Sequence, residues 1–376
     1  ENGHIAQLSK FHHSAIDGVS GAELLAATLD IEPTPRRVDP PERPWEPDRE
    51  PTELEMLNRG LIALSQRPLK DLRLFMETIN SLPELMRATG VEFPQLGRRR
   101  SAVLDGDEPL LSEASTKPPR VSFNSLISPH RRFAFVSLPF DDIKTVKNAF
   151  GVTVNDVVLA LSAGALRRYL EVHDELPDDP LIAMVPISVR TDDESGELGN
   201  QVASMTASLH TNVSNPVKRL RAIHRSMKVA KRQHKAIPAK LQVEMADFSP
   251  PAMSAQAERV AIRAAAKGWV DLPYNLVVSN VPGPQIPLYG IGAPMLANYP
   301  VSTITDGSGL NITAQSYSGS LDIGIVGGRE LVPDVWQIAD DFEAAMAELL
   351  AAANKHAKQQ AAAKRTRAKK AAAKKA

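Results

Sequence analysis

The chain has 376 residues, 43% of them hydrophobic and 23% charged. These fractions match ordinary globular proteins, which excludes a disordered or low-complexity chain, and the length suffices for two or three domains. The 44 basic and 44 acidic residues cancel, but nine basic and no acidic residues follow Asn354. Residues 1–354 therefore hold 35 basic and 44 acidic side chains, so an acidic body precedes a cationic C-terminal segment.

The chain contains no cysteine. Disulfides, thiol nucleophiles and cysteine-ligated metals are thereby excluded, and the composition is typical of a cytosolic protein. The most apolar stretch, residues 157–166, has half of the roughly 20 residues that a membrane-spanning helix needs. The N-terminal residues lack the charged region and apolar core of a signal peptide. Any chemistry must therefore come from histidine, serine or carboxylate side chains.

The first part of the chain predicts few regular elements. Residues 4–12 favour a weak strand, and Ser20 with Glu23 forms a capping-box pattern that predicts a helix start. Seven prolines between residues 33 and 51 predict an extended connector. Leucines spaced by three and four residues between 54 and 82 then predict two amphipathic helices. Residues 97–130 are poor in apolar runs and indicate a long exposed loop or a subdomain boundary.

Helices and strands alternate in the second part of the chain. Residues 131–139 predict a strand, Asp141 caps a short helix that ends at Gly151, and Thr153 begins a longer apolar helix. Asn215 and Pro216 begin a basic helix that ends near Lys235. Its charges either face CoA phosphates or anionic lipid or, since they are distributed all around the helix, indicate a solvated helix. The other expected elements are strands over 181–189, 202–210 and 275–281, helix over 238–268, antiparallel hairpins within 286–327, and a last helix from Pro333 into the tail.

The strongest chemical motif lies near the N-terminus, in the order His12, His13, Ser14, Ala15, Ile16, Asp17 and Gly18. A neutral imidazole takes a proton from a hydroxyl group near pH 7 while that hydroxyl attacks a carbonyl carbon. The alternative is that the two histidines bind zinc or stabilise a polar loop. No further ligand falls at a suitable spacing nearby, so we predict no metal. Asp17 either orients a histidine or holds the loop through a salt bridge.

The pattern His-His-x-x-x-Asp-Gly resembles the signature of the chloramphenicol-acetyltransferase-like superfamily. The surrounding sequence resembles the bacterial wax ester synthase/diacylglycerol acyltransferase family, in its mycobacterial form. Further segments that resemble the family follow in family order: Asn155 and Asp156 in VNDVVLALSAGALRRYL, Pro186 and Arg190 in VPISVR, Gly199 and Asn200 in LGNQ, and Ser279, Asn280, Pro282 and Gly283 in NLVVSNVPGP.

The resemblance implies that His13 is the general base for an acceptor hydroxyl that attacks an acyl-CoA thioester, with His12, Asp17 and Gly18 shaping the catalytic loop. No covalent acyl-enzyme and no bound cofactor are implied, since acyl-CoA is a co-substrate. Ser279 and Asn280 are candidate donors to the oxyanion, or they stabilise the Pro-Gly turn. Asn155 and Asp156 are candidate substrate-binding residues, or they cap their helix.

The implied fold class is α/β (α+β), with two chloramphenicol-acetyltransferase-like subdomains, mixed sheets and the active site between them. We expect residues 1–96 to belong to the N-terminal subdomain, 97–130 to a linker, 131–350 to the C-terminal subdomain and 351–376 to a basic tail. The family's Pro-Leu-Trp motif is absent, which predicts an incomplete N-terminal subdomain.

The predicted function is esterification of diacylglycerol to triacylglycerol, or of a long-chain alcohol to a wax ester. We expect a cytoplasmic protein, peripheral on the inner face of the plasma membrane or on lipid droplets, with no nucleic-acid partner. Two alternatives stay open: a non-catalytic lipid-surface protein with a truncated fold, and a condensation-type acyltransferase that uses carrier-bound acyl groups. The Asp-Phe-Gly-Trp-Gly motif of the condensation relatives is absent.

Overall fold

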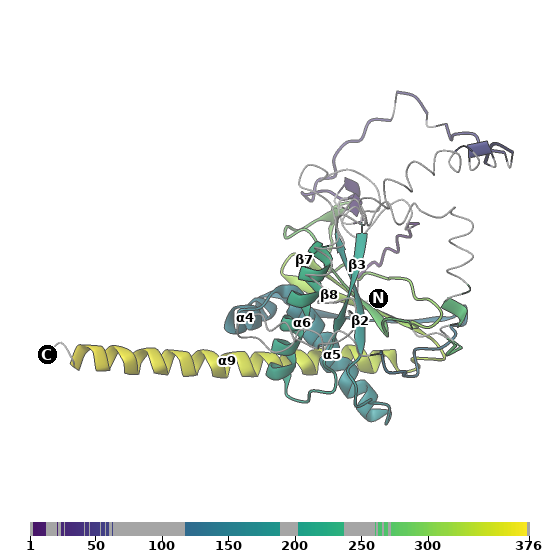
Figure 1. Cartoon of the computed structure of the whole chain (residues 1–376). Helices are drawn as coiled ribbons and strands as arrows, with labels where there is room; N and C mark the ends of the chain where they lie inside the picture. Colours follow the sequence, from purple (N-terminus) through teal and green to yellow (C-terminus); the bar gives the residue numbers. More distant parts are fainter. Residues whose placement is uncertain are drawn as a thin grey trace.

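A computed structural model of the chain describes residues 3–12, 117–188, 202–236 and 272–373, together with short pieces between 21 and 62 and between 260 and 269. Within these described residues, the regular structure is concentrated after residue 130 (Figure 1). Two predictions lie outside the described residues, namely the helix start at Ser20 and the second amphipathic helix after residue 68. Most of the helix expected over 238–268 also lies outside them.

The centre of the fold is a six-stranded mixed sheet in the order β1-β8-β7-β4-β2-β3. Strands β7, β4 and β2 are parallel, whereas the β1–β8, β7–β8 and β2–β3 pairs are antiparallel. The mixed sheet that the sequence predicts is thereby confirmed. The strands are β1 (Arg131–Pro139), β2 (Ile182–Ser188), β3 (Val202–Ser208), β4 (Leu276–Val281), β7 (Leu310–Tyr317) and β8 (Ser320–Gly328).

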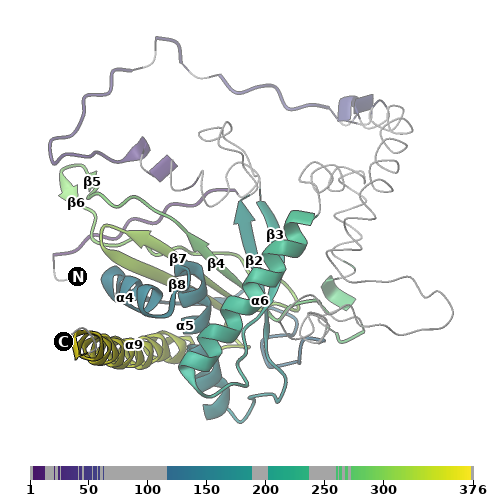
Figure 2. The ribbon, with the colours of Figure 1, turned by 60° about the vertical axis from the view of Figure 1, so that its left-hand side comes forward.

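Helices of the described residues cover one face of this sheet (Figure 2). The strands alternate as the pleat requires: Ala134, Val136 and Leu138 of β1 are buried in the core, whereas the residues between them are more exposed. The helix face of the sheet is therefore apolar, and its opposite face is available for polar residues. The helices are α4 (Phe140–Phe150), α5 (Val154–Val172), α6 (Pro216–Ala236) and α9 (Val335–Ala373).

Helix α5 is the most buried helix of the described part of the chain. Its start is confirmed, because Thr153 is the N-cap and forms a capping box with Asp156. Gly151 ends α4 with φ 67°, the left-handed conformation that favours glycine. A Cβ atom on Gly164 would lie 2.9 Å from the Cβ of Ala345 in α9. Glycine at this position therefore allows α5 and α9 to pack closely.

Helix α9 has 39 residues and continues far beyond the sheet (Figure 1). Its first half is part of the core, with Phe342, Leu349 and Ala353 among the buried residues. The ring of His356 stacks on Phe150 with 5.4 Å between centroids. The helix passes residue 351 without a break, so the predicted tail begins as a continuation of a core helix.

A small hairpin, β5 (Tyr289–Gly290) and β6 (Ala293–Pro294), connects the N-terminal residues to the body. Asp30 and Tyr289 exchange two backbone hydrogen bonds of 2.8 and 2.7 Å. With the β7–β8 hairpin, this confirms the antiparallel hairpins expected between residues 286 and 327. No single described helix is long and apolar enough to cross a membrane, although α4 and α5 pass that test as a pair bent by 104°.

Three local predictions are wrong. Residues 4–12 form no strand, and Ile5 and Leu8 are exposed, because no described strand lies beside them to share ladder hydrogen bonds. Asp141 does not cap α4: it lies in the first turn and bonds to Lys144, while the N-cap is Pro139. Of the expected loop 97–130, residues 97–116 lie outside the described residues, and the described part is not exposed throughout, because Phe123 is completely buried.

Helix α6 also differs from the solvated helix that its charges predict. Leu220, Ile223 and Met227 lie in the core, at a spacing that places them on one face. Arg219 is 97% buried, and its guanidinium donates to the carbonyl oxygen of Val213 at 2.8 Å. The basic residues therefore surround a buried apolar stripe, which the high overall charge of this segment conceals.

Candidate functional site

The residues of the predicted catalytic loop are only partly described. His12 is exposed, whereas His13, Asp17 and Gly18 lie outside the described residues. The blocks around Arg190 and around Gly199 and Asn200 lie outside them too. The geometry of the candidate site therefore comes from the C-terminal half, where Asn155, Asp156, Ser279 and Asn280 are all placed.

A layer of buried polar side chains covers the sheet face opposite the helices. Thr313 of β7 donates to Asn311 at 2.8 Å and lies 2.7 Å from the hydroxyl of Ser302. The side-chain amide of Asn298 donates to Gln315 at 3.0 Å. These bonds hold the segment around residues 298–302 over the sheet. The face is thus polar but internally hydrogen-bonded, as burial requires.

Ser279 and Asn280 lie on opposite faces of β4. Ser279 is paired in register with Thr313 and shares its polar face. Asn280 follows the alternation of Leu276 and Val278, which are buried under the helices. The structure does not bring the two side chains together, because adjacent residues of a strand point in opposite directions. Of the two, only Ser279 lies on the polar face.

Asp156 is at the centre of a compact hydrogen-bonded group. One of its carboxylate oxygens, Oδ2, accepts from the backbone and hydroxyl of Thr153, both at 2.8 Å. The same oxygen accepts from Nδ1 of His224 in α6, also at 2.8 Å. The Asp156 side chain is only 2% exposed. This carboxylate caps α5 and fastens α6 to its first turn, while the neighbouring Asn155 is half-buried.

His224 is a residue that the motif analysis missed. A carboxylate only accepts hydrogen bonds, so Nδ1 of His224 bears the proton in this pair. The side chain is 36% exposed, which leaves part of the ring at the surface. A buried acid that orients a half-exposed imidazole is a common catalytic arrangement. The pair is separated by 68 residues in the sequence, so no local pattern could reveal it.

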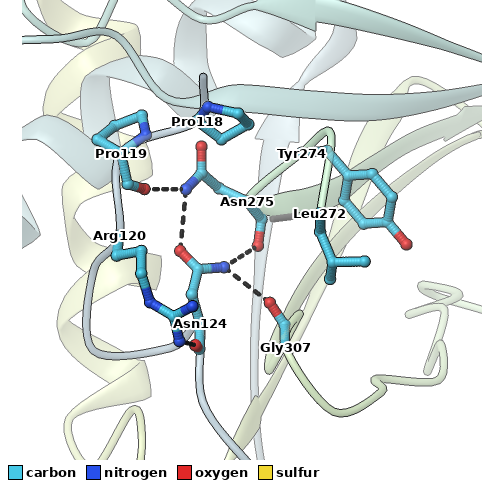
Figure 3. A pocket seen from close by; sticks show the side chains of 8 residues that line it. All are labelled: Pro118, Pro119, Arg120, Asn124, Leu272, Tyr274, Asn275 and Gly307. Carbon is cyan, nitrogen blue, oxygen red and sulfur yellow. Dashed lines mark hydrogen bonds between the residues drawn. The ribbon is translucent and has the colours of Figure 1, made fainter. Parts of the chain in front are cut away.

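A second polar group lies at the amino end of β4 (Figure 3). Asn124 donates to the carbonyl oxygens of Asn275 and Gly307 at 2.8 and 2.9 Å, and Asn275 donates back to Asn124 at 2.9 Å. The adjacent cavity has a volume of about 20 Å³, enough for one water molecule. These asparagines therefore anchor the loop before β1 and do not form a substrate pocket.

Shifted pKa values occur mainly in the helix layer. Burial lowers the pKa of the Arg219 guanidinium, raises that of the Asp341 carboxyl and raises the pKa of Tyr169 to about 12. All three residues belong to helices of the apolar core. Within the described residues, no group of three histidines or carboxylates is placed to bind a metal ion.

Comparison with known proteins identifies the chain. Residues 1–158 match the model of the wax ester synthase/diacylglycerol acyltransferase catalytic domain, and residues 198–350 match that of the WS/DGAT C-terminal domain. The two models together define an acyltransferase. A putative diacylglycerol O-acyltransferase of Mycobacterium tuberculosis is 37% identical over 350 residues, which cover 93% of this chain and 71% of the relative.

The chain therefore belongs to the wax ester synthase/diacylglycerol acyltransferase family, and the resemblance seen in its motifs is confirmed. The O-acyltransferase WSD of Acinetobacter baylyi is 32% identical over 91% of this chain and 69% of its own length. A solved wax ester synthase/diacylglycerol acyltransferase from Marinobacter aquaeolei VT8 matches with a TM-score of 0.58 and 28% identity, covering 91% of this chain and 67% of that one.

The bond between Asp156 and His224 predicts energetic coupling between α5 and α6. In a double-mutant cycle of Asp156→Asn and His224→Ala, we expect a coupling of about 0.5 to 3 kcal/mol in the free energy of unfolding, as for residues in contact. Urea unfolding measures it. His130→Ala, an exposed histidine before β1, is the control partner and should couple by less than about 0.5 kcal/mol with Asp156→Asn. Equal coupling in both cycles would contradict the assignment.

Proposed function

We propose that this chain transfers the acyl group of acyl-CoA to the free hydroxyl of diacylglycerol, giving triacylglycerol, and that a long-chain alcohol is a second acceptor. The observation that supports this best is the match to named diacylglycerol O-acyltransferases over 93% of the chain. That match includes the region of the two histidines. The reaction needs no resident cofactor, because the thioester is itself the activated donor.

The proposed reaction is a direct transfer. His13 accepts the proton of the acceptor hydroxyl while the oxygen of that hydroxyl bonds to the thioester carbonyl carbon. The tetrahedral intermediate then collapses, the carbon–sulfur bond breaks, and the CoA thiolate takes the proton from His13. His12, Asp17 and Gly18 fix the position of the base. The absence of cysteine agrees with a mechanism without an acyl-enzyme.

We assign stabilisation of the oxyanion to Ser279 and not to Asn280. Ser279 lies on the polar face of the sheet in register with Thr313, away from the four core helices. Asn280 is half-buried and follows the alternation of Leu276 and Val278, which places it on the helix side of β4. A hydroxyl that donates to the developing oxyanion contributes most in the transition state. Asn155 is proposed to contact substrate, whereas Asp156 supports it by capping α5.

His13→Ala is the direct test of the base. Purified protein is incubated with labelled acyl-CoA and diacylglycerol, and labelled triacylglycerol is measured. Loss of the base should lower turnover by about 10² to 10⁴-fold. His130→Ala is the matched control and should retain full activity. Wild-type turnover in His13→Ala would refute the assignment of His13 as the general base. If the unaltered chain forms no triacylglycerol, the proposed activity is refuted.

Ser279→Ala and Asn280→Ala separate the two faces of β4. Removal of one oxyanion donor costs about 10² to 10³-fold in kcat, so Ser279→Ala should lower kcat by about 10²-fold with little change in KM or thermal stability. Asn280→Ala should lower the melting temperature and leave kcat nearly unchanged, because this residue lies on the helix side of β4. The reverse pattern in kinetics and thermal unfolding would refute the assignment of Ser279.

We further propose that the enzyme works at the cytoplasmic face of the plasma membrane, or on lipid droplets, through its cationic C-terminal segment. Seven basic residues lie after Lys358 and no acidic ones. Each contributes about 1 kcal/mol of attraction near an anionic leaflet. The last buried residue of α9 within the described core is Ala353, and residues 357–362 are exposed, so the helix has left the packed body before the basic residues begin.

Deletion of residues 359–376 should therefore abolish binding to anionic vesicles at low salt and leave turnover on detergent-dispersed substrate unchanged. Co-sedimentation with vesicles measures the first effect. A full-length variant with the seven basic residues after Lys358 changed to glutamine is the control for length and should also lose binding. Since salt screens such attraction, unchanged binding of either variant at low salt would count against the anchor.

A further inference from the structure

A second cavity lies at the edge of the sheet, between β1 and the first turns of α9. It has a volume of about 250 Å³, and Phe135, Tyr299 and Trp336 form its aromatic lining. Strands β8 and β7 separate β1 from β4 and Ser279. At about 4.8 Å between neighbouring strands, β1 and β4 are roughly 14 Å apart. The cavity therefore lies three strands away from Ser279.

The aromatic rings form a corner that is open to solvent. The ring of Phe135 lies 4.4 Å from that of Tyr299 and 5.1 Å from that of Trp336, which is inclined to it by 67°. Phe135 is 40% exposed and Trp336 50% exposed. Large rings that are grouped and left exposed are uncommon on a surface without a ligand. Because Phe135 and Trp336 are inclined to each other, one ligand can contact the faces of both rings.

A buried carboxylate fixes the position of Tyr299. Asp322 is completely buried, and its Oδ1 accepts from the Ser137 hydroxyl at 2.7 Å. Its Oδ2 accepts from the backbone of Asn298 at 2.8 Å. Because the Ser137 proton is engaged with Asp322, the hydroxyl of Tyr299, 2.9 Å away, donates to Ser137. A phenol that donates in this way has a more electron-rich ring, which favours a cation beside it.

Two carboxylates lie along the same stripe of α9. Trp336, Asp340 and Glu343 line the cavity at a spacing of four and three residues, which places them on one helix face. Asp340 and Glu343 are exposed, and neither forms an ion pair with another described residue. Aromatic faces with unpaired carboxylates beside them attract a positive charge and repel anions.

We propose that this cavity binds a small organic cation with a methylated ammonium group. Such a group is weakly hydrated, so it enters an aromatic corner at lower cost than a primary ammonium ion, and its recognition by aromatic cages is general. Phe135 and Trp336 contact its methyl groups, Tyr299 closes one side, and Asp340 and Glu343 balance its charge. A soluble amine and a lipid headgroup can both carry such a methylated ammonium group.

The test uses the full chain with Trp45→Phe and Trp269→Phe, in which Trp336 is the remaining tryptophan. Tryptophan fluorescence is titrated with choline chloride, tetramethylammonium chloride and the neutral isostere 3,3-dimethyl-1-butanol at constant ionic strength. We expect a saturable change with both cations and at least tenfold weaker binding of the alcohol. Equal binding of the alcohol, or no change with either cation, would overturn the proposal.

Charge variants complete the test. Asp340→Asn with Glu343→Gln should weaken choline binding at least tenfold. Asp178→Asn with Asp179→Asn removes the same charge from the exposed α5–β2 loop and should leave binding unchanged. Equal weakening in both would contradict a local site. Binding to phosphatidylcholine vesicles that free choline competes away would identify a lipid headgroup as the source, whereas binding of free choline alone would identify a soluble amine.

Discussion

The close packing of α5 against α9 fixes the helix layer on which the central sheet rests. Thirteen of the 19 residues of α5 are buried, so this helix has almost no solvated face. Gly164 is the point of closest approach, since an added Cβ would meet both Ala345 and the buried guanidinium of Arg219. Helices α5, α6 and α9 therefore have little freedom to move separately, and the sheet that packs against them is held rigidly as well.

This rigidity has a chemical consequence. The helix face of the sheet is filled with aliphatic side chains, whereas the opposite face holds hydrogen-bonded polar residues such as Asn311, Thr313 and Gln315. A donor that must hold its position to within a fraction of an ångström benefits from a supporting layer that does not yield. This difference between the two faces agrees with the role proposed for Ser279, which lies on the polar face of a strand that the packed helices support from the other side.

Much of the C-terminal half could be predicted from the sequence, because its signals are local. The limits of β1 follow from alternation, and the start of α5 follows from Thr153 and Asp156. The family also followed from local motifs. The opposite orientation of Ser279 and Asn280 could also be predicted, because successive side chains of a strand point to opposite faces. The Asp156–His224 bond was not, because only tertiary packing brings them together. The strand expected over 4–12 failed because a strand needs a neighbour that periodicity cannot supply.

The single helix that joins the core to the cationic end has a consequence for folding. An isolated Ala/Lys segment of about 15 residues is only marginally helical in water, because the first turn is costly to nucleate. In this chain the first turns of α9 are already ordered by the core, and residues up to Ala373 extend a helix that exists. The charged end is therefore helical by propagation alone. The helical backbone of this segment therefore depends on the folded body, so unfolding of the body would also be expected to unfold the C-terminal half of α9.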